Sequence, residues 1–199
     1  RDPGSGFVLV AGEINGYSQS FRAAMFQVVS HITTTGYAST GFAHWPGMLP
    51  ILMIMLAFIG GCSGSTSGGI KVARVQLVIQ QGLRELKQLV HPKAQLLVTL
   101  GGKRVSESVV ISVGGFCALY ISVYLILLLL LASDGVDVET GFSAVAACLN
   151  NLGPGLGKVA ADFIALSDFS TWLMSFAMLV GRLEIFTILI LFTPAFWQE

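Results

Sequence analysis

Charged residues are scarce in this chain of 199 residues. Asp, Glu, Lys and Arg make up 11% of it, whereas they form about a quarter of a typical soluble domain. The formal net charge is zero, so the overall charge does not point to nucleic acid or to an acidic partner. Hydrophobic residues account for 54% of the chain. This composition excludes an ordinary soluble domain and indicates an integral membrane protein.

Cysteine and histidine are also few, with three of each, and they are widely spaced. A metal site favours paired ligands such as C-x-x-C, and a disulfide framework needs an even number of cysteines. We therefore expect Cys62, Cys117 and Cys148 to be structural thiols. Apart from Arg182 and Glu184, the expected spanning segments contain no acid, base or metal ligand that could form a cluster. The sequence predicts that the chain is not an enzyme.

One uncharged run, residues 109–132, is long enough to cross a membrane. At about 1.5 Å per residue it exceeds the hydrocarbon core of roughly 30 Å. Seven of the eleven basic residues lie between positions 71 and 104, whereas acidic residues gather at 134–139 and 162–168. The positive-inside rule places the basic region in the cytoplasm. A final helix over 169–192 would then bring the C-terminus back to the cytoplasm.

Two apolar segments, 21–33 and 140–149, are too short to span, so we expect them to re-enter the membrane. Each runs into a polar, glycine-containing stretch, and the two stretches lie 117 residues apart. Gly64 follows Gly36 by 28 residues, and Gly181 follows Gly153 by the same number. A duplicated hairpin explains this spacing. The sequence predicts an all-α integral membrane fold of repeated membrane-pore-membrane hairpins, with re-entrant half-helices and broken second helices.

This prediction divides the chain into three parts. Residues 1–79 form a pore unit without its first span, 80–108 form a basic connector along the cytoplasmic interface, and 109–199 form a complete pore unit. The chain begins at Arg1 with neither a Met nor a signal-peptide pattern. We therefore expect a piece of a longer protein, in which the missing span precedes Arg1.

The two glycine-containing stretches can supply backbone carbonyls to a cation. Extended backbone at membrane depth is tolerated only where it is buried in protein or lines water. Carbonyl oxygens there can replace the hydration shell of an ion, and the partially negative C-terminal ends of the short helices favour a cation. Ordinary turns between helices are the alternative. The predicted filter residues are Thr33, Thr34, Thr35, Gly36, Tyr37, Asn150, Asn151, Leu152 and Gly153.

A run of ten residues with five glycines interrupts the helix that follows the first filter stretch. Glycine disfavours helix by about 1 kcal/mol relative to alanine, and the run falls just beneath the predicted filter. We interpret it as a gate, with a passive kink as the alternative. A phosphate-binding loop would need G-K-[ST] where Gly69 is followed by Ile70. The predicted gate residues are Gly60, Gly61, Cys62, Ser63, Gly64, Ser65, Thr66, Ser67, Gly68 and Gly69.

Arg182 stands in the last expected helix, at the position that corresponds to Ser65. An arginine in a spanning helix costs at least about 2.5 kcal/mol unless it faces partners or water. Pairing with Glu184 is one possibility, but residues two apart on a helix do not face each other. We expect Arg182 to project toward the run 60–69 as an electrostatic barrier or gate contact.

Together, the stretches 33–37, 60–74, 150–155 and 181–184 resemble the membrane subunit of the Trk-type bacterial potassium uptake system, over the C-terminal half of that family. The resemblance implies four pore units around one pore in the bacterial inner membrane, with K⁺ as the transported ion and no catalytic cofactor. Gly36 would be the filter glycine of the third unit and Gly153 that of the fourth. Residues 60–69 would be the gate loop and Arg182 the arginine that faces it.

The resemblance also implies partners: membrane lipid, the remaining pore units, a second copy in a homodimer and a cytoplasmic nucleotide-binding regulatory subunit. Nucleic acid is not among them. Candidate contacts for the regulatory subunit are Arg84, Lys87 and Lys93. Neither loop carries the Thr-Val-Gly-Tyr-Gly filter, so we expect a weaker preference among alkali cations than in tetrameric potassium channels. Sodium/potassium cotransport, a membrane-embedded enzyme and a non-conducting assembly subunit remain alternatives.

Overall fold

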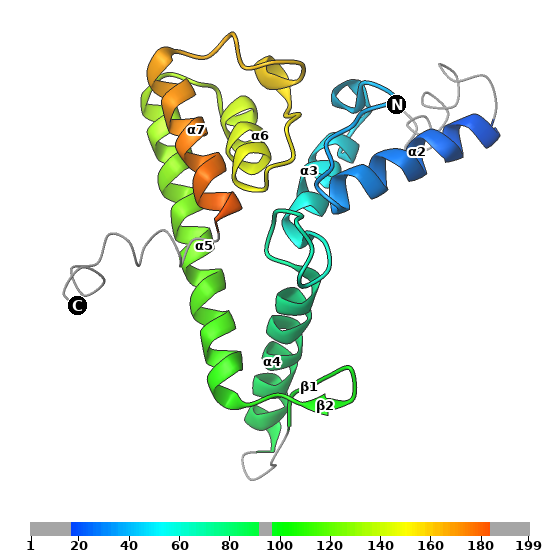
Figure 1. Ribbon diagram of the computed structural model, residues 1–199, viewed down its shortest axis with the longest axis vertical. Helices are drawn as coiled ribbons and strands as arrows, with labels where there is room; N and C mark the ends of the chain where they lie inside the picture. Colours follow the sequence, from blue (N-terminus) through cyan, green and yellow to red (C-terminus); the bar gives the residue numbers. More distant parts are fainter. Residues whose placement is uncertain (1–16, 92–96, 184–199) are drawn as a thin grey trace.

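The chain is helical in this computed structural model, which describes residues 17–91 and 97–183 (Figure 1). Two short 3₁₀ helices, η1 (Phe42–His44) and η2 (Gly157–Val159), and a two-stranded hairpin complete the regular structure of that part. The α-helices are α2 (Tyr17–Ile32), α3 (Leu49–Ile59), α4 (Val72–Val90), α5 (Glu107–Ser133), α6 (Val138–Leu149) and α7 (Asp168–Arg182). The expected short and long helices are present, with ends that differ by a few residues.

Helix α5 is the expected first span of the complete unit. Within the described ranges it is the one helix that is long and apolar enough to cross a membrane, with 27 residues. The shorter apolar helices are α3 and α6. Of the last expected helix, the structure shows α7 up to Arg182 with Leu183 as its cap, and residues 184–192 lie outside the described residues.

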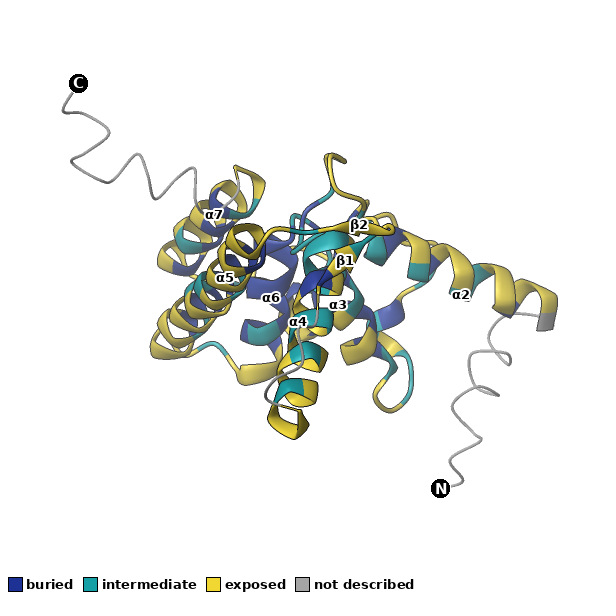
Figure 2. Cartoon of the chain, turned by 90° about the horizontal axis from the view of Figure 1, so that it is seen from below, coloured by how far each residue is buried: buried dark blue, intermediate teal, exposed yellow. Residues whose placement is uncertain are grey.

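Helix α6 lies at the centre of the upper part of the molecule, between α5 and α7 on one side and α3 on the other (Figures 1 and 2). Its side chains from Ser143 to Leu149 are fully buried. Asp137 begins the helix by accepting a hydrogen bond from the backbone N–H of Thr140 at 3.1 Å. The hydroxyl and backbone N–H of Thr140 lower the pKa of this carboxyl to about 2. The cap fixes the start of α6, and the burial of residues 143–149 places its C-terminal end in the protein interior.

The predicted break after α3 is present. Helix α3 ends at Ile59, and the chain returns to helix at Val72. The two ends of the interruption are tied together, since the amide of Ile70 donates to the Phe58 carbonyl at 3.0 Å and that of Val72 to the Gly61 carbonyl at 3.1 Å. The break is therefore a closed loop between two helices.

The predicted boundary between the first pore unit and a connector at 79/80 has no counterpart in the structure. Helix α4 continues through it to Val90. Gly82 disfavours the helix by only about 1 kcal/mol relative to alanine, which is too little to end a helix of 19 residues. Below the break, α4 packs on the lower part of α5 around Leu77, Val98, Val110 and Val113. Val98 of the expected connector is buried in this cluster, whereas the apolar residues on the last turns of α4, Leu83, Leu86, Leu89 and Val90, are exposed.

A hairpin also occupies part of the predicted connector. Strands β1 (Thr99–Leu100) and β2 (Lys103–Arg104) pair antiparallel, with Thr99 opposite Arg104. Gly101 and Gly102 make the turn with φ of 57° and 78°. Two consecutive positive φ angles are the requirement of a tight type I′ hairpin turn. The Gly-Gly pair was the sequence signal for this element, and the sequence interpretation overlooked it.

Candidate functional site

The short helix α2 ends in a Schellman turn at the first predicted filter stretch. The amide of Thr34 donates to the carbonyl of His31 at 3.1 Å, and the amide of Thr35 donates to the carbonyl of Ser30 at 2.9 Å. Thr34 adopts a left-handed conformation with φ of 51°. This pair of bonds and the left-handed residue define the motif. The turn reverses the chain immediately after the helix.

The short helix α6 ends in the same turn, 117 residues later. The amide of Asn151 donates to the carbonyl of Cys148 at 3.1 Å, and that of Leu152 to the carbonyl of Ala147 at 2.8 Å. Asn151 has φ of 54°, within a few degrees of Thr34. The repeat inferred from the sequence therefore extends to individual hydrogen bonds.

The two predicted filter stretches lie against each other. A β-carbon added at Gly36 would lie 1.9 Å from the carbonyl oxygen of Leu152 and 3.4 Å from the Pro154 ring. Gly36 and Gly153 both have positive φ, 78° and 104°, as their matched positions predict. Only a residue without a side chain permits this approach. The structure thus brings a backbone oxygen of one loop to the glycine of the other.

Different side chains hold the two loops. In the first loop, hydroxyls bond back to the same segment: Ser30 Oγ donates to the Tyr37 carbonyl at 2.7 Å and Thr33 Oγ1 to the Val29 carbonyl at 2.6 Å. In the second, Asn151 Nδ2 donates to the carbonyl of Met178 on α7 at 3.3 Å. The second loop is therefore tied to a neighbouring helix.

The run 60–69, the predicted gate loop, touches both filter loops through Gly68. Its amide donates to Thr34 Oγ1 at 2.8 Å. A β-carbon added at Gly68 would lie 1.8 Å from the carbonyl oxygen of Asn150. The run therefore lies directly against the ends of both short helices, as the sequence predicted from its distance along the chain.

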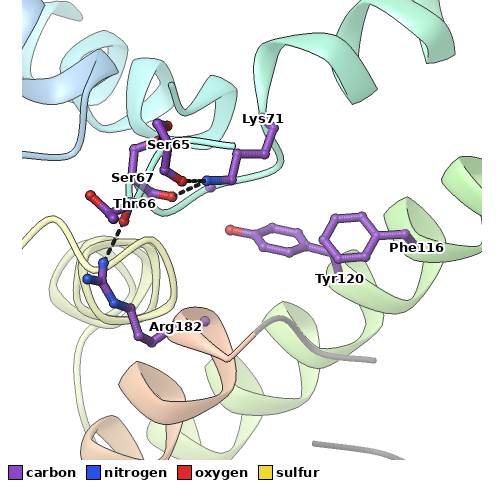
Figure 3. Close-up of a pocket in the computed structure, with 9 residues that line it drawn as sticks. Ser65, Thr66, Ser67, Lys71, Phe116, Tyr120 and Arg182 are labelled. Carbon is purple, nitrogen blue, oxygen red and sulfur yellow. Dashed lines mark hydrogen bonds between the residues drawn. The ribbon is translucent and has the colours of Figure 1, made fainter. Parts of the chain in front are cut away.

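Two cations hold three consecutive carbonyls of this run (Figure 3). Arg182 Nη1 donates to the carbonyl of Thr66 at 2.5 Å, which is the direction that the sequence predicted for this side chain. Lys71 Nζ donates to the carbonyls of Ser65 and Ser67, both at 2.6 Å. The sequence analysis did not predict the contact of Lys71. The available signal was its position, since Lys71 is the first basic residue after the glycine run.

A cavity of about 230 Å³ lies between this run, α5 and α7. Its lining combines the two cations with serine and threonine groups and two aromatic rings of α5 (Figure 3). The lining residues are Ser65, Thr66, Ser67, Gly69, Lys71, Phe116, Tyr120, Gly181 and Arg182. The cavity is therefore bordered by the predicted gate loop and by both cations that hold it.

The other candidate residues lie away from the loops. Arg84 on α4 forms an ion pair with Glu107 at 2.9 Å. Lys87 stands in the last turn of α4, while Lys93 and Glu184 lie outside the described residues. Among residues 17–91 and 97–183, no cluster of His, Cys, Asp and Glu could hold a metal ion. The three cysteines are free thiols, of which Cys62 is exposed in the run 60–69.

Comparisons with known proteins agree with the architecture. A model of the TrkH family, described as cation transport protein, matches residues 10–199. The Trk system potassium uptake protein TrkH of Vibrio parahaemolyticus is 51% identical over 180 residues, which are 90% of this chain and 37% of that protein. TrkH of Escherichia coli K12 is 48% identical over the same shares.

A solved structure agrees as well. The crystal structure of the potassium transporter TrkH from Vibrio parahaemolyticus superimposes with a TM-score of 0.87 at 48% identity, covering 98% of this chain and 42% of that one. The chain therefore spans about two fifths of the length of the relatives it matches.

Proposed function

Because this chain belongs to the TrkH family of cation transport proteins, we propose that it supplies two of the filter loops of a pore that takes up potassium across the bacterial inner membrane. Its relatives are named as potassium uptake proteins, so the family resemblance drawn from the motifs is confirmed, and their function is transport, not enzyme catalysis. No chemical step is needed, because an inside-negative potential supplies roughly 2.3 kcal/mol per charge per 100 mV.

The approach of Gly36 to the Leu152 carbonyl carries this proposal. Loops that served only as turns would have no reason to meet from helices 117 residues apart. In the proposed filter, carbonyls of residues 33–37 and 150–153 take the place of water around K⁺. The C-terminal ends of α2 and α6, which carry partial negative charge, favour the cation at the same point.

The proposal is tested in a hybrid subunit, in which this chain replaces the matching part of TrkH from Vibrio parahaemolyticus. We expect the hybrid subunit to take up K⁺ in preference to Na⁺ in bacteria without other potassium uptake systems. Gly153→Ala should lower the ratio of K⁺ to Na⁺ uptake rates about tenfold, because its φ of 104° costs an L-residue roughly 1–2 kcal/mol. An unchanged ratio would favour a scaffold or an enzyme. Uptake of K⁺ that requires Na⁺ would favour cotransport.

The run 60–69 is proposed to gate this pore. It lies against both filter loops and is held by Arg182 and Lys71 on carbonyls of its middle. If the gate opened by moving this run, the three carbonyls would lose their hydrogen bonds to charged donors. Because such bonds are strong, other partners would have to replace them. A passive kink would not need cations at its centre.

Replacing Arg182 by leucine is expected to raise the leak of K⁺ through the closed hybrid subunit by about tenfold or more. The variant loses a charge-assisted hydrogen bond to Thr66, which is worth about 1.5–3 kcal/mol. The leak is measured as K⁺ efflux from liposomes that contain the purified subunit alone. Lys158→Leu also removes a positive charge, but from a surface pair with Asp137, and it should leave the leak unchanged. An equal leak in both variants would contradict the gate.

The proposed partners follow from the family. They are the remaining pore units of a longer subunit, a second copy in a homodimer, membrane lipid and a cytoplasmic nucleotide-binding regulatory subunit. The basic end of α4 with Arg84 and Lys87, together with Lys93, is the proposed contact of the regulatory subunit. The C-terminus is proposed to lie in the cytoplasm, as the charge distribution favours.

A further inference from the structure

The phenol of Tyr120 reaches the foot of the second filter loop from the middle of α5. Its Oη donates a hydrogen bond to Asn150 Oδ1 at 2.6 Å, and both side chains are buried, with 3% and 0% exposed. Asn150 Nδ2 is buried and has no hydrogen-bond partner among the described residues. Within that part of the chain, the phenol is therefore the only hydrogen-bond partner of the Asn150 side chain.

Asn150 occupies a position where small displacements matter. It is the first residue after α6, and its amide still bonds to the Ala146 carbonyl at 3.0 Å. Its own carbonyl lies so close to Gly68 that a β-carbon there would be 1.8 Å away. Asn150 thus begins the second loop of the proposed filter and lies directly against the proposed gate loop.

The ring of Tyr120 is itself held firmly. It packs edge-on to the ring of Phe58 on α3, with 6.2 Å between the ring centroids. The centroid of the Phe116 ring, one turn away on α5, lies at 6.1 Å. The Phe116 ring in turn carries the Arg74 guanidinium 4.1 Å from its centre. A ring fixed from both sides places its hydroxyl within a narrow range, so the bond to Asn150 has a defined direction.

We infer that Tyr120 is a positioning residue that sets the ion selectivity of the second filter loop through Asn150. This inference rests on the pore proposed above. The hydrogen bond fixes the side chain of Asn150 and thereby the direction of the backbone that continues into residues 151–153. The first loop is held by hydroxyls of its own segment, so selectivity depends on Tyr120 through the second loop alone.

The test is Tyr120→Phe in the hybrid subunit, which keeps the ring and removes only the hydroxyl. Tyr124→Phe is the matched control. Tyr124 lies one turn further along α5 and also donates a hydrogen bond, which is partly buried, to the Phe142 carbonyl at 2.9 Å, in the first half of α6 and away from the loop. Both variants lose one hydrogen bond from α5 to α6, so a general loss of stability should affect both alike.

We expect the ratio of K⁺ to Na⁺ uptake rates to fall about fivefold in Tyr120→Phe and to remain unchanged in Tyr124→Phe, since one hydrogen bond contributes about 1 kcal/mol. A ratio of rates does not depend on how much protein reaches the membrane. Asn150→Ala removes the same bond from the other side, and its effect should not add to that of Tyr120→Phe in the double variant. Additive effects would contradict the inference.

The outcomes separate this inference from the proposed function. Should Gly153→Ala shift the ratio while Tyr120→Phe and Asn150→Ala both leave it unchanged, the pore stands and the role of Tyr120 is wrong. Equal shifts in Tyr120→Phe and Tyr124→Phe would reduce Tyr120 to a general packing residue. If Gly153→Ala leaves the ratio unchanged, the filter itself is refuted.

Discussion

Gly36→Ala should abolish potassium uptake by the hybrid subunit. The added methyl group would lie 1.9 Å from the Leu152 carbonyl oxygen, and backbone cannot move aside as a flexible side chain does. The loops would have to separate by more than 1 Å, and a misplacement of that size at a preorganised site lowers rates about a hundredfold. The φ of 78° adds backbone strain of roughly 1–2 kcal/mol. Initial rates of K⁺ uptake measure the loss.

Gly47→Ala provides the matched control. Its φ of 68° carries the same backbone cost, but nothing lies within 4 Å of the added β-carbon. We expect uptake close to that of the unaltered hybrid subunit. If both variants transport equally well, the close approach of the two loops is irrelevant to conduction.

Gly181→Ala is expected to produce a large loss of stability. A β-carbon at this position of α7 would lie 1.9 Å from the Leu149 carbonyl oxygen and 3.0 Å from Asn151 Nδ2. Helix α7 would have to move off the end of α6, which is fully buried. Overpacking typically costs about 1–3 kcal/mol, and we expect the upper end of this range because the clash is with backbone. Thermal unfolding of the purified hybrid subunit in detergent should show a clearly lower midpoint.

Gly114→Ala in α5 makes the same chemical change but is not expected to lower the midpoint of thermal unfolding. Nothing lies within 4 Å of the added β-carbon, and alanine favours a helix interior by about 1 kcal/mol over glycine. The midpoint should therefore stay the same or rise. A fall of equal size in both variants would show that the substitutions act through something other than the contact between α6 and α7.

The features that were predictable from the sequence are those with a local signal. The lengths of the apolar segments predicted α2, α3, α5 and α6, and the run of five glycines predicted the break at 60–69. The spacing of Gly36 and Gly153 predicted a duplicated segment, and the structure repeats its backbone conformation in the turns at Thr34 and Asn151. Arg182 could be placed because an arginine at membrane depth needs a partner.

The features that were missed have different physical reasons. The bond from Tyr120 to Asn150 spans 30 residues, and a tyrosine in an apolar helix gives no sign of such a partner. The continuation of α4 past position 79 was hidden by the change from apolar to polar residues, which reflects what surrounds the helix and not where it ends. Lys71 was counted among the basic residues of the cytoplasmic side. Its ammonium group also donates hydrogen bonds to carbonyls of the run 60–69, which its charge alone did not indicate.

Lys71 and Arg182 hold the run 60–69 from two different parts of the fold. The carbonyls of Ser65 and Ser67 point to one side of the backbone and that of Thr66 points to the other. Lys71 therefore binds the run from one side and Arg182 binds it from the opposite side. Lys71 belongs to the segment that leads into α4, whereas Arg182 belongs to a separate helix. If the Arg182 bond broke, Lys71 would still connect the loop to the start of α4. In the proposed gate, a displacement of α4 would therefore be transmitted to this loop through Lys71.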